Sequence, residues 1–236
     1  MSALGHYLEE EGIASVAIAL IRPQAENTRP PRALWVPFEL GRPIGPPSDP
    51  VFQKRVILAA LGLLSAPRQA SLIVDFPDDD PREAPDPGWR APIPPAAEHG
   101  AEALEAELRA LAPAYAASCT RRERSTVGLS GLPPAECGAY VAAWLRGDPP
   151  ASPVADMSSP LALRFAIDDL KAFALEAALA GGGKPSSQQL GDWLWNETVL
   201  AASVQALRRD FLASGDERLK TIAFFLVPAL RVPPGG

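Results

Sequence analysis

Cysteine and histidine are scarce in this 236-residue sequence, with two of each. Cys119 and Cys137 cannot build a disulfide framework, and together with His6 and His99 they are too few for a Cys/His zinc site. No apolar run approaches the roughly 18 residues that a membrane-spanning helix needs. The first residues carry glutamates at 9–11 in place of the basic and apolar stretch of a secretory signal. We therefore expect a cytoplasmic protein with no membrane partner.

An excess of positive charge is also absent. Lys and Arg number 22 against 28 Asp and Glu, which gives a net charge of −6 at pH 7. A negative chain repels phosphate backbones, so we expect no nucleic acid partner. In contrast, 47% of the residues are hydrophobic, and a chain of this length can bury a sizeable core. The composition therefore predicts a soluble globular protein.

Proline is abundant, with 27 residues, and its clusters divide the chain. The first part alternates helical and strand patterns, which predicts an α/β unit over residues 1–76 with a small, partly parallel sheet and flanking helices. Turn residues and apolar spacing set the expected elements. In chain order these are a helix ending at Gly12, a strand within Ile13–Ile21, a loop over Arg22–Arg32, an extended segment at Ala33–Phe38, a helix from Val51 capped by Ser48 or Asp49, and a strand at Leu72–Phe76.

Residues 77–98 are rich in proline and aspartate, a composition that cannot bury a core of its own. We interpret them as a linker or surface loop. Beyond them, apolar residues recur with the helical period, so residues 99–236 are expected to form an α-helical half. The predicted helices are Ala101–Leu111, Pro134–Leu145, Leu161–Leu179, Gln188–Leu212 and Glu217–Leu226.

Residues 5–64 contain a helix ending near Gly12, a strand at Val16–Leu20, a segment at Arg32–Pro37, a turn of the form Leu-Gly-x-Pro at residues 40–43, and a helix at Val51–Leu64. This order resembles the carboxyl-terminal part of the selenoprotein B subunits of the glycine, sarcosine and betaine reductases and of the related D-proline reductase subunit. In that family a redox motif of selenocysteine or cysteine followed by Cys-x-x-Cys directly precedes this order. The present sequence lacks that motif, and both of its cysteines lie far along the chain.

The resemblance implies an α/β fold in the first third and a pocket near the turn that follows the strand, where ligands of open α/β sheets gather. Every substrate of the family carries a carboxylate, and arginine forks suit that group. Arg32 and Arg42 are therefore candidates for contact with an anionic substrate or a partner, together with Gly41 and Gly45 of the same turn. The alternative is that these arginines pair at the surface with Glu26 or Glu39.

A second candidate site consists of carboxylates on the predicted helices. Glu197 falls on the same helical face as apolar residues, and Asp169 and Glu176 lie seven residues apart on one side of another helix. Acids in apolar surroundings can act as general acid or base, or can share a metal. With His6 as an added ligand, Asp169, Glu176 and Glu197 would suit iron or manganese. Alternatively, Glu197 pairs with an arginine and the other acids face solvent.

Cys119 precedes a run of arginines, which would favour its thiolate and makes it the better nucleophile candidate of the two cysteines. The alternative is a solvated loop without a role. Trp193 and Trp195 are two residues apart and cannot both face inward on one helix. One of them is therefore expected to lie in a groove or at a protein interface.

The leading functional hypothesis is a bacterial subunit or accessory component of an oxidoreductase-like complex, which binds a small anionic substrate or a partner and whose redox atom comes from elsewhere. The carboxylates and Cys119 support an alternative, a stand-alone enzyme with Glu197, Asp169 or Cys119 as catalytic groups. A third hypothesis is a non-catalytic interaction protein. The expected partners are another protein or a second copy, with a small carboxylate as a further ligand; no cofactor is identified.

Overall fold

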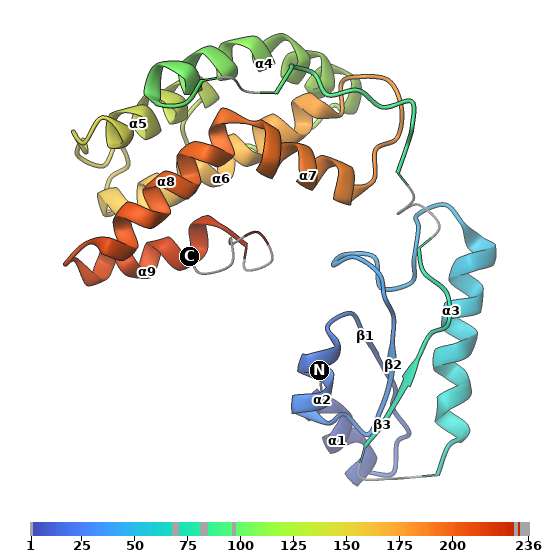
Figure 1. The fold of residues 1–236 in the computed structure, drawn as a ribbon. Coiled ribbons are helices and arrows are strands. Elements are labelled where there is room, and N and C mark those ends of the chain that lie inside the picture. The colour runs from blue at the N-terminus through green and yellow to red at the C-terminus, as the bar shows by residue number, and fades with distance from the viewer. Residues whose placement is uncertain (1, 68–70, 81–84, 96–97, 229–230, 232–236) are drawn as a thin grey trace. The chain divides into compact units, whose positions relative to one another are not determined.

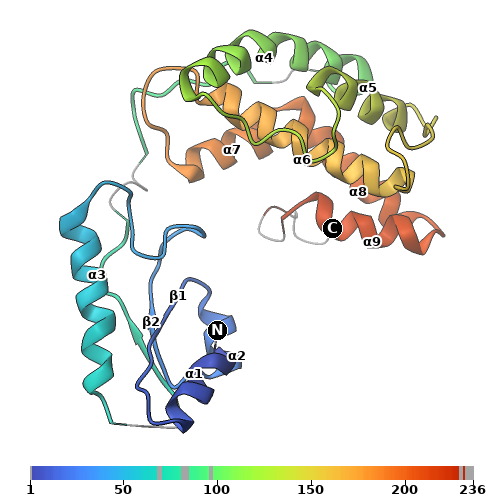
Figure 2. The ribbon, with the colours of Figure 1, turned by 180° about the vertical axis from the view of Figure 1, so that it is seen from behind.

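The computed structural model describes residues 2–67, 71–80, 85–95, 98–228 and 231. The chain divides into two compact units, Met1–Ala84 and Pro85–Gly236, here called the first and second units. Figures 1 and 2 show the first unit in blue to cyan and the second in green to red. Each unit has its own hydrophobic core. Part of the expected linker, residues 85–95, belongs to the second unit, where Trp89 Nε1 donates to Ala178 O at 3.2 Å.

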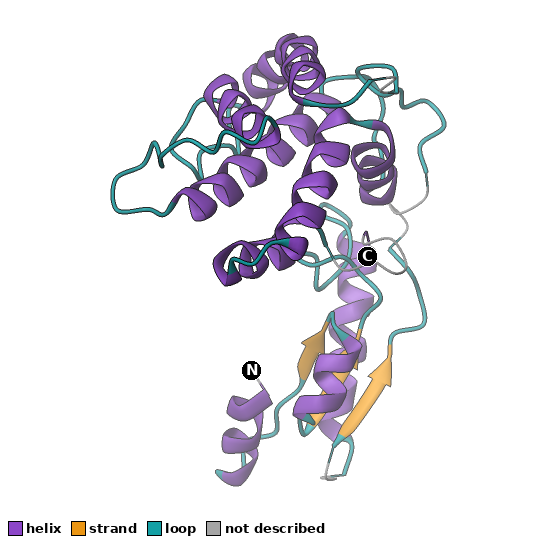
Figure 3. Cartoon of the chain, turned by 60° about the vertical axis from the view of Figure 1, so that its left-hand side comes forward, coloured by secondary structure: helices purple, strands orange, loops and turns teal. Residues whose placement is uncertain are grey.

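The first unit is built around a three-stranded sheet of order β1-β2-β3, in which both strand pairs are parallel. The three strands lie side by side in Figure 3. The α/β prediction for this part is thus confirmed, and the sheet is fully rather than partly parallel among the described strands. The elements are α1 (Ser2–Glu10), β1 (Ala17–Ala19), α2 (Arg22–Thr28), β2 (Arg32–Trp35), α3 (Pro50–Gly62), the 3-10 turn η1 (Leu63–Ser65) and β3 (Leu72–Asp75).

The predicted loop over Arg22–Arg32 is wrong in part, because α2 occupies its first seven residues. Pro23 lies in the first turn of that helix, where a backbone N–H has no intrahelical partner to lose. A proline that reads as a loop signal therefore starts a helix here. The predicted strand at Ile13–Ile21 shrinks to Ala17–Ala19.

The core of the first unit lies between α3 and the sheet. Phe52, Val56 and Ala60 of α3 are buried against Leu34 and the residues that follow β2 and β3. Three phenylalanine rings, Phe38, Phe52 and Phe76, pack with centroids 5.5 to 5.9 Å apart. Asp49 caps α3, as one of the two predicted caps, by accepting the amide of Phe52 at 3.0 Å.

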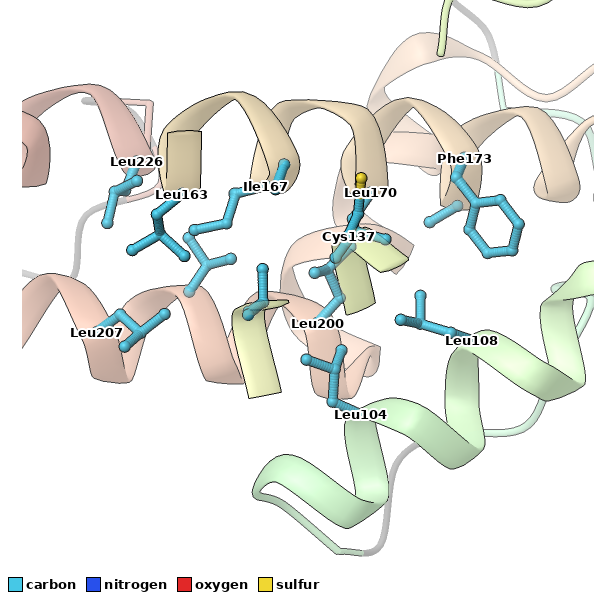
Figure 4. Packing of buried hydrophobic residues seen from close by; sticks show 14 of the residues in the cluster. Leu104, Leu108, Cys137, Leu163, Ile167, Leu170, Phe173, Leu200, Leu207 and Leu226 are labelled. Carbon is cyan, nitrogen blue, oxygen red and sulfur yellow. The ribbon is translucent and has the colours of Figure 1, made fainter. Parts of the chain in front are cut away.

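The second unit is α-helical in its described residues, as predicted for this half of the chain. Helix α6 packs against α4, α5, α7, α8 and α9, and small buried alanines along it allow these close approaches. Figure 4 shows leucines from α4, α6, α8 and α9 meeting in the core. The helices are α4 (Ala101–Arg122), α5 (Pro134–Leu145), α6 (Ser159–Ala178), α7 (Ser187–Glu197), α8 (Val199–Ala213) and α9 (Glu217–Leu226).

Two predicted helices have different bounds in the structure. The single helix expected over Gln188–Leu212 is divided by Thr198, whose extended backbone ends α7 and whose hydroxyl accepts the amide of Ala201 at 3.1 Å to cap α8. Helix α4 continues past the predicted end at Leu111 to Arg122, with Pro113 on its exposed side. Among the described helices, none combines the length and apolar content that crossing a membrane requires.

Candidate functional site

The sheet of the first unit is open at β1. Val36 N–H donates to Ala19 O at 2.9 Å, so Ala19 directs its backbone groups toward β2. Successive residues of a strand direct these groups to opposite edges, and Ile18 and Leu20 therefore face the open side. Within the described residues, no hydrogen bond reaches the outward N–H and C=O groups of these two. This edge is available to a further strand.

A groove of about 690 Å³ lies along the open edge, which we call the β1 groove. Its volume is within the usual range for ligand sites. Among the described residues, no aspartate, glutamate, lysine or arginine lines it. The polar side chains described there are neutral amides and hydroxyls and His6, whose Nε2 lies 2.7 Å from Arg29 O. The lining residues are Ser2, Ala3, His6, Ala17, Ile18, Ala19, Leu20, Ile21, Gln24, Ala25, Thr28, Pro30 and Leu40.

Large apolar side chains are exposed around the first unit. Leu40, which lines the β1 groove, is 73% exposed, and Ile21 of the same groove is also exposed. Ile57, Leu58 and Leu61 are exposed on α3, alongside the exposed Lys54 and Arg55, so the outer surface of this helix mixes apolar and charged side chains. The first unit therefore exposes large apolar side chains both at the β1 groove and on α3.

Arg32 was a candidate for anion contact, but the structure places it inside the first unit. It is 5% exposed and forms an ion pair with Glu9. Its Nη2 and Nε donate to Ala66 O at 2.9 and 3.3 Å. The amide of Ser15, bonded at 2.7 Å, and the Arg32 charge together hold the pKa of Glu9 below its usual value against the effect of burial. The Arg32 guanidinium thus has internal partners within the first unit.

Arg42 pairs with Glu39, as the alternative interpretation of this residue predicts. Its Nη1 lies 3.5 Å from Glu39 and 3.8 Å from Asp80. Gly41 and Gly45 both have positive φ, at 92° and 87°. Glycine adopts this backbone conformation readily, so the turn is sufficient reason for both residues. A Cβ at Gly45 would lie 2.5 Å from the ring of Phe52. None of these three turn residues lines the β1 groove.

Asp169 and Glu176 of α6 both bind one loop, residues 123–131, which joins α4 to α5. Asp169 accepts the amides of Gly128, Leu129 and Ser130, each at 2.8 Å, and the Ser130 hydroxyl at 2.6 Å. Burial alone would raise the pKa of Asp169, but these donors outweigh it and hold the pKa below its ordinary value. The carboxylate supplies the loop with the acceptors that its own backbone lacks.

Glu176 binds the start of the same loop. It accepts the amide and hydroxyl of Thr126 at 2.7 and 2.8 Å and the hydroxyl of Ser125 at 2.8 Å, and Arg122 lies 3.7 Å away. Here too burial opposes the hydrogen bonds, and the net effect lowers the pKa of Glu176. Both acids are therefore held as carboxylates with their oxygens occupied, which leaves neither as a proton donor for catalysis.

The predicted metal site is not assembled. In the described ranges, no three His, Cys, Asp or Glu side chains lie together as ligands of a metal ion. His6 belongs to the first unit and bonds to Arg29 O. Asp169 and Glu176 hold the loop instead, and the half-buried Glu197 at the end of α7 does not join them.

Cys119 lies on α4 rather than in the solvated loop of the alternative interpretation. Its sulfur is 4.0 Å from Glu176 Oε2. The arginines that suggested an activated thiol have other partners, since Arg122 faces Glu176 and Arg121 donates to Leu179 O. Cys137 is buried, and burial raises the pKa of its thiol. Among the described residues, the carboxylate beside Cys119, Glu176, already accepts hydrogen bonds from Ser125 and Thr126.

The two tryptophans of α7 differ in burial, as expected for residues two apart on one helix. Trp193 is 1% exposed and packs edge-on against Trp89, with centroids 6.5 Å apart. Trp195 is partly buried, with Lys171 Nζ 5.7 Å from its ring centroid. Trp193 thus belongs to the core, and a partner contact through Trp195 stays a prediction.

Glu107 of α4 is a buried carboxylate that sequence reasoning missed. It accepts the amides of Val199 and Leu200 at 2.6 and 2.9 Å and so binds the first turn of α8. Burial raises the pKa of Glu107, and the two amides act in the opposite direction. Its position in the apolar stripe of Leu104, Leu108 and Leu111 was a usable signal.

Comparison of the chain with protein-family models, with curated proteins and with solved structures found no match.

Proposed function

We propose that this chain is a non-catalytic component of a larger assembly, and that its first unit binds a partner protein by adding an extended segment of that partner to β1. The observation that supports this proposal best is the β1 groove, which combines an open strand edge with an uncharged lining. Strand addition uses main-chain hydrogen bonds for affinity and side-chain pockets for specificity.

The absence of charge at this edge is informative. Natural proteins protect exposed edge strands with charged residues, proline or bulges, because a free edge pairs with other chains. Charged residues make up 21% of the sequence, yet none of the described residues that line the β1 groove is an aspartate, glutamate, lysine or arginine. An edge without such protection is expected where pairing is the function.

The sheet itself is small for its type. Parallel sheets usually have both faces covered, and sheets most often contain about four to six strands. With three parallel strands among the described residues and exposed apolar side chains on α3, the first unit resembles part of a wider α/β layer. A partner strand beside β1 would extend that layer.

This proposal agrees with the hypothesis of an accessory subunit in an oxidoreductase-like complex, in which another chain supplies the redox atom. That hypothesis allowed either a small anionic substrate or a partner as the bound molecule, and the present proposal retains the partner protein. Arg32 and Arg42 are engaged within the first unit, and the carboxylates of α6 hold a loop. The stand-alone enzyme with interhelical carboxylates therefore has no supporting observation.

The test uses peptides selected from a displayed random library against the full chain, with affinity measured by fluorescence polarisation. We expect apolar, extended peptides, and protection of the Ile18 and Leu20 amides from hydrogen exchange on binding. Leu20→Pro removes an outward N–H and no bond to β2, so it should weaken binding about tenfold, or by about 1.4 kcal/mol.

Matched leucine variants provide the control. Leu40→Ser removes an exposed side chain from the β1 groove, whereas Leu61→Ser removes one from α3. The first should weaken peptide binding and the second should not. Failure to select any peptide, or equal binding by the wild type and Leu20→Pro, would contradict the proposal. A mass that doubles with concentration in light scattering would identify the partner as a second copy.

A further inference from the structure

The second unit contains a separate cavity between α4 and α5, of about 290 Å³, which we call the α4–α5 pocket. Its floor is formed by the buried side chains of Leu108 and Phe173, which Figure 4 shows at the same end of the core. Its walls are the small side chains of Ala112 on α4 and Ala135 and Ala139 on α5. The pocket is thus apolar inside and open to solvent between two helices.

The contact between the two helices explains why space remains. Gly138 of α5 faces Leu108, and a Cβ there would lie 2.4 Å from Leu108 Cδ1. The helices therefore approach closely at Gly138, while the neighbouring alanines are too short to fill the volume beside it. At the roughly 30 Å³ that a water-sized group occupies in a liquid, the pocket accommodates about ten non-hydrogen atoms.

The charges at the mouth of the pocket favour one type of ligand. Glu105 and Arg109 both line the mouth, one turn apart on α4. Glu105 bonds to Arg146 at 3.0 Å, so a partner outside the pocket balances its charge. Arg109 reaches Glu105 only at 4.0 Å and its side chain is 72% exposed. The pocket thus combines an apolar interior with a guanidinium that has room for another acceptor.

We infer that the α4–α5 pocket binds a small carboxylate with an apolar body, with the hydrocarbon part against Leu108 and Phe173 and the carboxylate on Arg109. A medium-chain fatty acid has this size and polarity. A guanidinium binds a carboxylate through two parallel N–H donors, which an alcohol or an amine cannot use in the same way. This inference concerns the second unit and is independent of the proposed function of β1.

Sodium octanoate is the probe, and calorimetric titration of the full chain measures its affinity. We expect octanoate to bind at least tenfold more tightly than 1-octanol or octylamine, and to shift the NMR signals of the Leu108 methyl groups. Arg109→Gln should remove the preference for octanoate over 1-octanol. No binding of octanoate, or equal affinity of the wild type for octanoate and 1-octanol, would overturn the inference.

Two leucine variants on exposed alanines separate pocket filling from a general effect. Ala139→Leu places a larger side chain in the pocket, whereas Ala117→Leu adds the same atoms to α4 outside it. We expect Ala139→Leu to weaken octanoate binding at least tenfold and Ala117→Leu to leave it unchanged. Both substitutions are on helix surfaces, and circular dichroism verifies the fold. Equal affinity of Ala139→Leu and the wild type would place the ligand elsewhere and contradict the inference.

Discussion

The two units bury their carboxylates in different ways. In the first unit, Glu9 pairs with a guanidinium, Arg32, as well as with an amide. In the second unit, Asp169 and Glu107 accept mainly backbone amides, from a loop and from the first turn of α8. Glu176 accepts one amide and two hydroxyls of the same loop and lies 3.7 Å from Arg122. The first arrangement balances charge, and the second replaces missing secondary structure. Substitution of these carboxylates in the second unit should therefore leave backbone N–H groups without an acceptor, rather than leave a single unpaired charge.

The units also differ in how far their secondary-structure elements are covered by other elements. The other five helices described for the second unit surround α6, whereas the first unit has an open strand edge and exposed apolar side chains on α3. A ligand in the second unit would therefore enter a small pocket between helices, and a partner of the first unit would join its sheet. The following predictions test these differences, beginning with the largest effect.

Asp169→Ala should have the largest effect on the second unit. It leaves three amides and a hydroxyl of residues 128–130 without their acceptor. We expect the free energy of unfolding to fall by about 4 kcal/mol, at about 1–3 kcal/mol for each unsatisfied group with partial compensation by water. Urea unfolding followed by tryptophan fluorescence measures it. Asp169→Asn, which keeps one acceptor oxygen, should lose less; a loss below about 1 kcal/mol for alanine would refute the role of the carboxylate.

Gly45→Ala should have a smaller effect, on the first unit. Both Gly45 and Gly41 have positive φ, but only Gly45 is close to another side chain, the ring of Phe52. We expect a loss of about 1 kcal/mol for Gly41→Ala from the backbone alone, and about 2–3 kcal/mol for Gly45→Ala. Thermal unfolding of both variants measures the difference. Equal losses would show that the ring moves aside without cost.

The pH dependence of stability should have opposite signs for different carboxylates. The pKa values of Asp169 and Glu176 are lowered by folding, so their contribution is present above the ordinary carboxyl range near 4 and is lost as the pH falls through the lowered values. The pKa of Glu107 is raised, so its contribution is present below that range and is lost as the pH rises through the raised value.

Urea midpoints measured across acidic and neutral pH test these signs. Asp169→Asn should flatten the loss of stability on acidification, and Glu107→Gln should flatten the loss on raising the pH. If both variants keep the wild-type profile, the carboxylates titrate alike in the folded and unfolded chain, contrary to the hydrogen bonds described.

Arg42→Gln should have the smallest effect. The Arg42 guanidinium lies 3.5 Å from the partly exposed Glu39 and 3.8 Å from the buried Asp80, so we expect a loss of about 1 kcal/mol. Arg32→Gln removes a buried partner of Glu9 and should lower the melting temperature of the first unit distinctly more. Similar melting temperatures for the two variants would mean that the Glu9 pair adds nothing to stability.

Local signals predicted many of the elements. Pro134–Leu145 was predicted with the bounds that α5 has, because a proline at its start and an unbroken helical period define it. The split at Thr198 was not predicted, because a threonine cap interrupts the helix without interrupting the apolar period.

The site residues were harder to interpret. Asp169 and Glu176 were correctly singled out as acids in apolar surroundings, but their partners are in a loop about 40 to 50 residues earlier. Periodicity shows which face a residue occupies and does not show what another segment brings to it. The same limit applies to Arg32, which begins β2 and whose partner Glu9 comes from α1. The β1 groove depends on strand order, which no local pattern contains.

The parallel sheet also has a consequence for the order of folding. Ala33 of the central strand pairs with Ala17 on one side and with Ile73 on the other, so the second pairing must close a much longer loop than the first. Contacts between residues distant in sequence slow folding, whereas helices form from local contacts. We expect refolding of the first unit, reported by Trp35, to be slower than refolding of the helical unit. During synthesis, the side of β2 that pairs with β3 would then stay unpaired until residue 75 has left the ribosome.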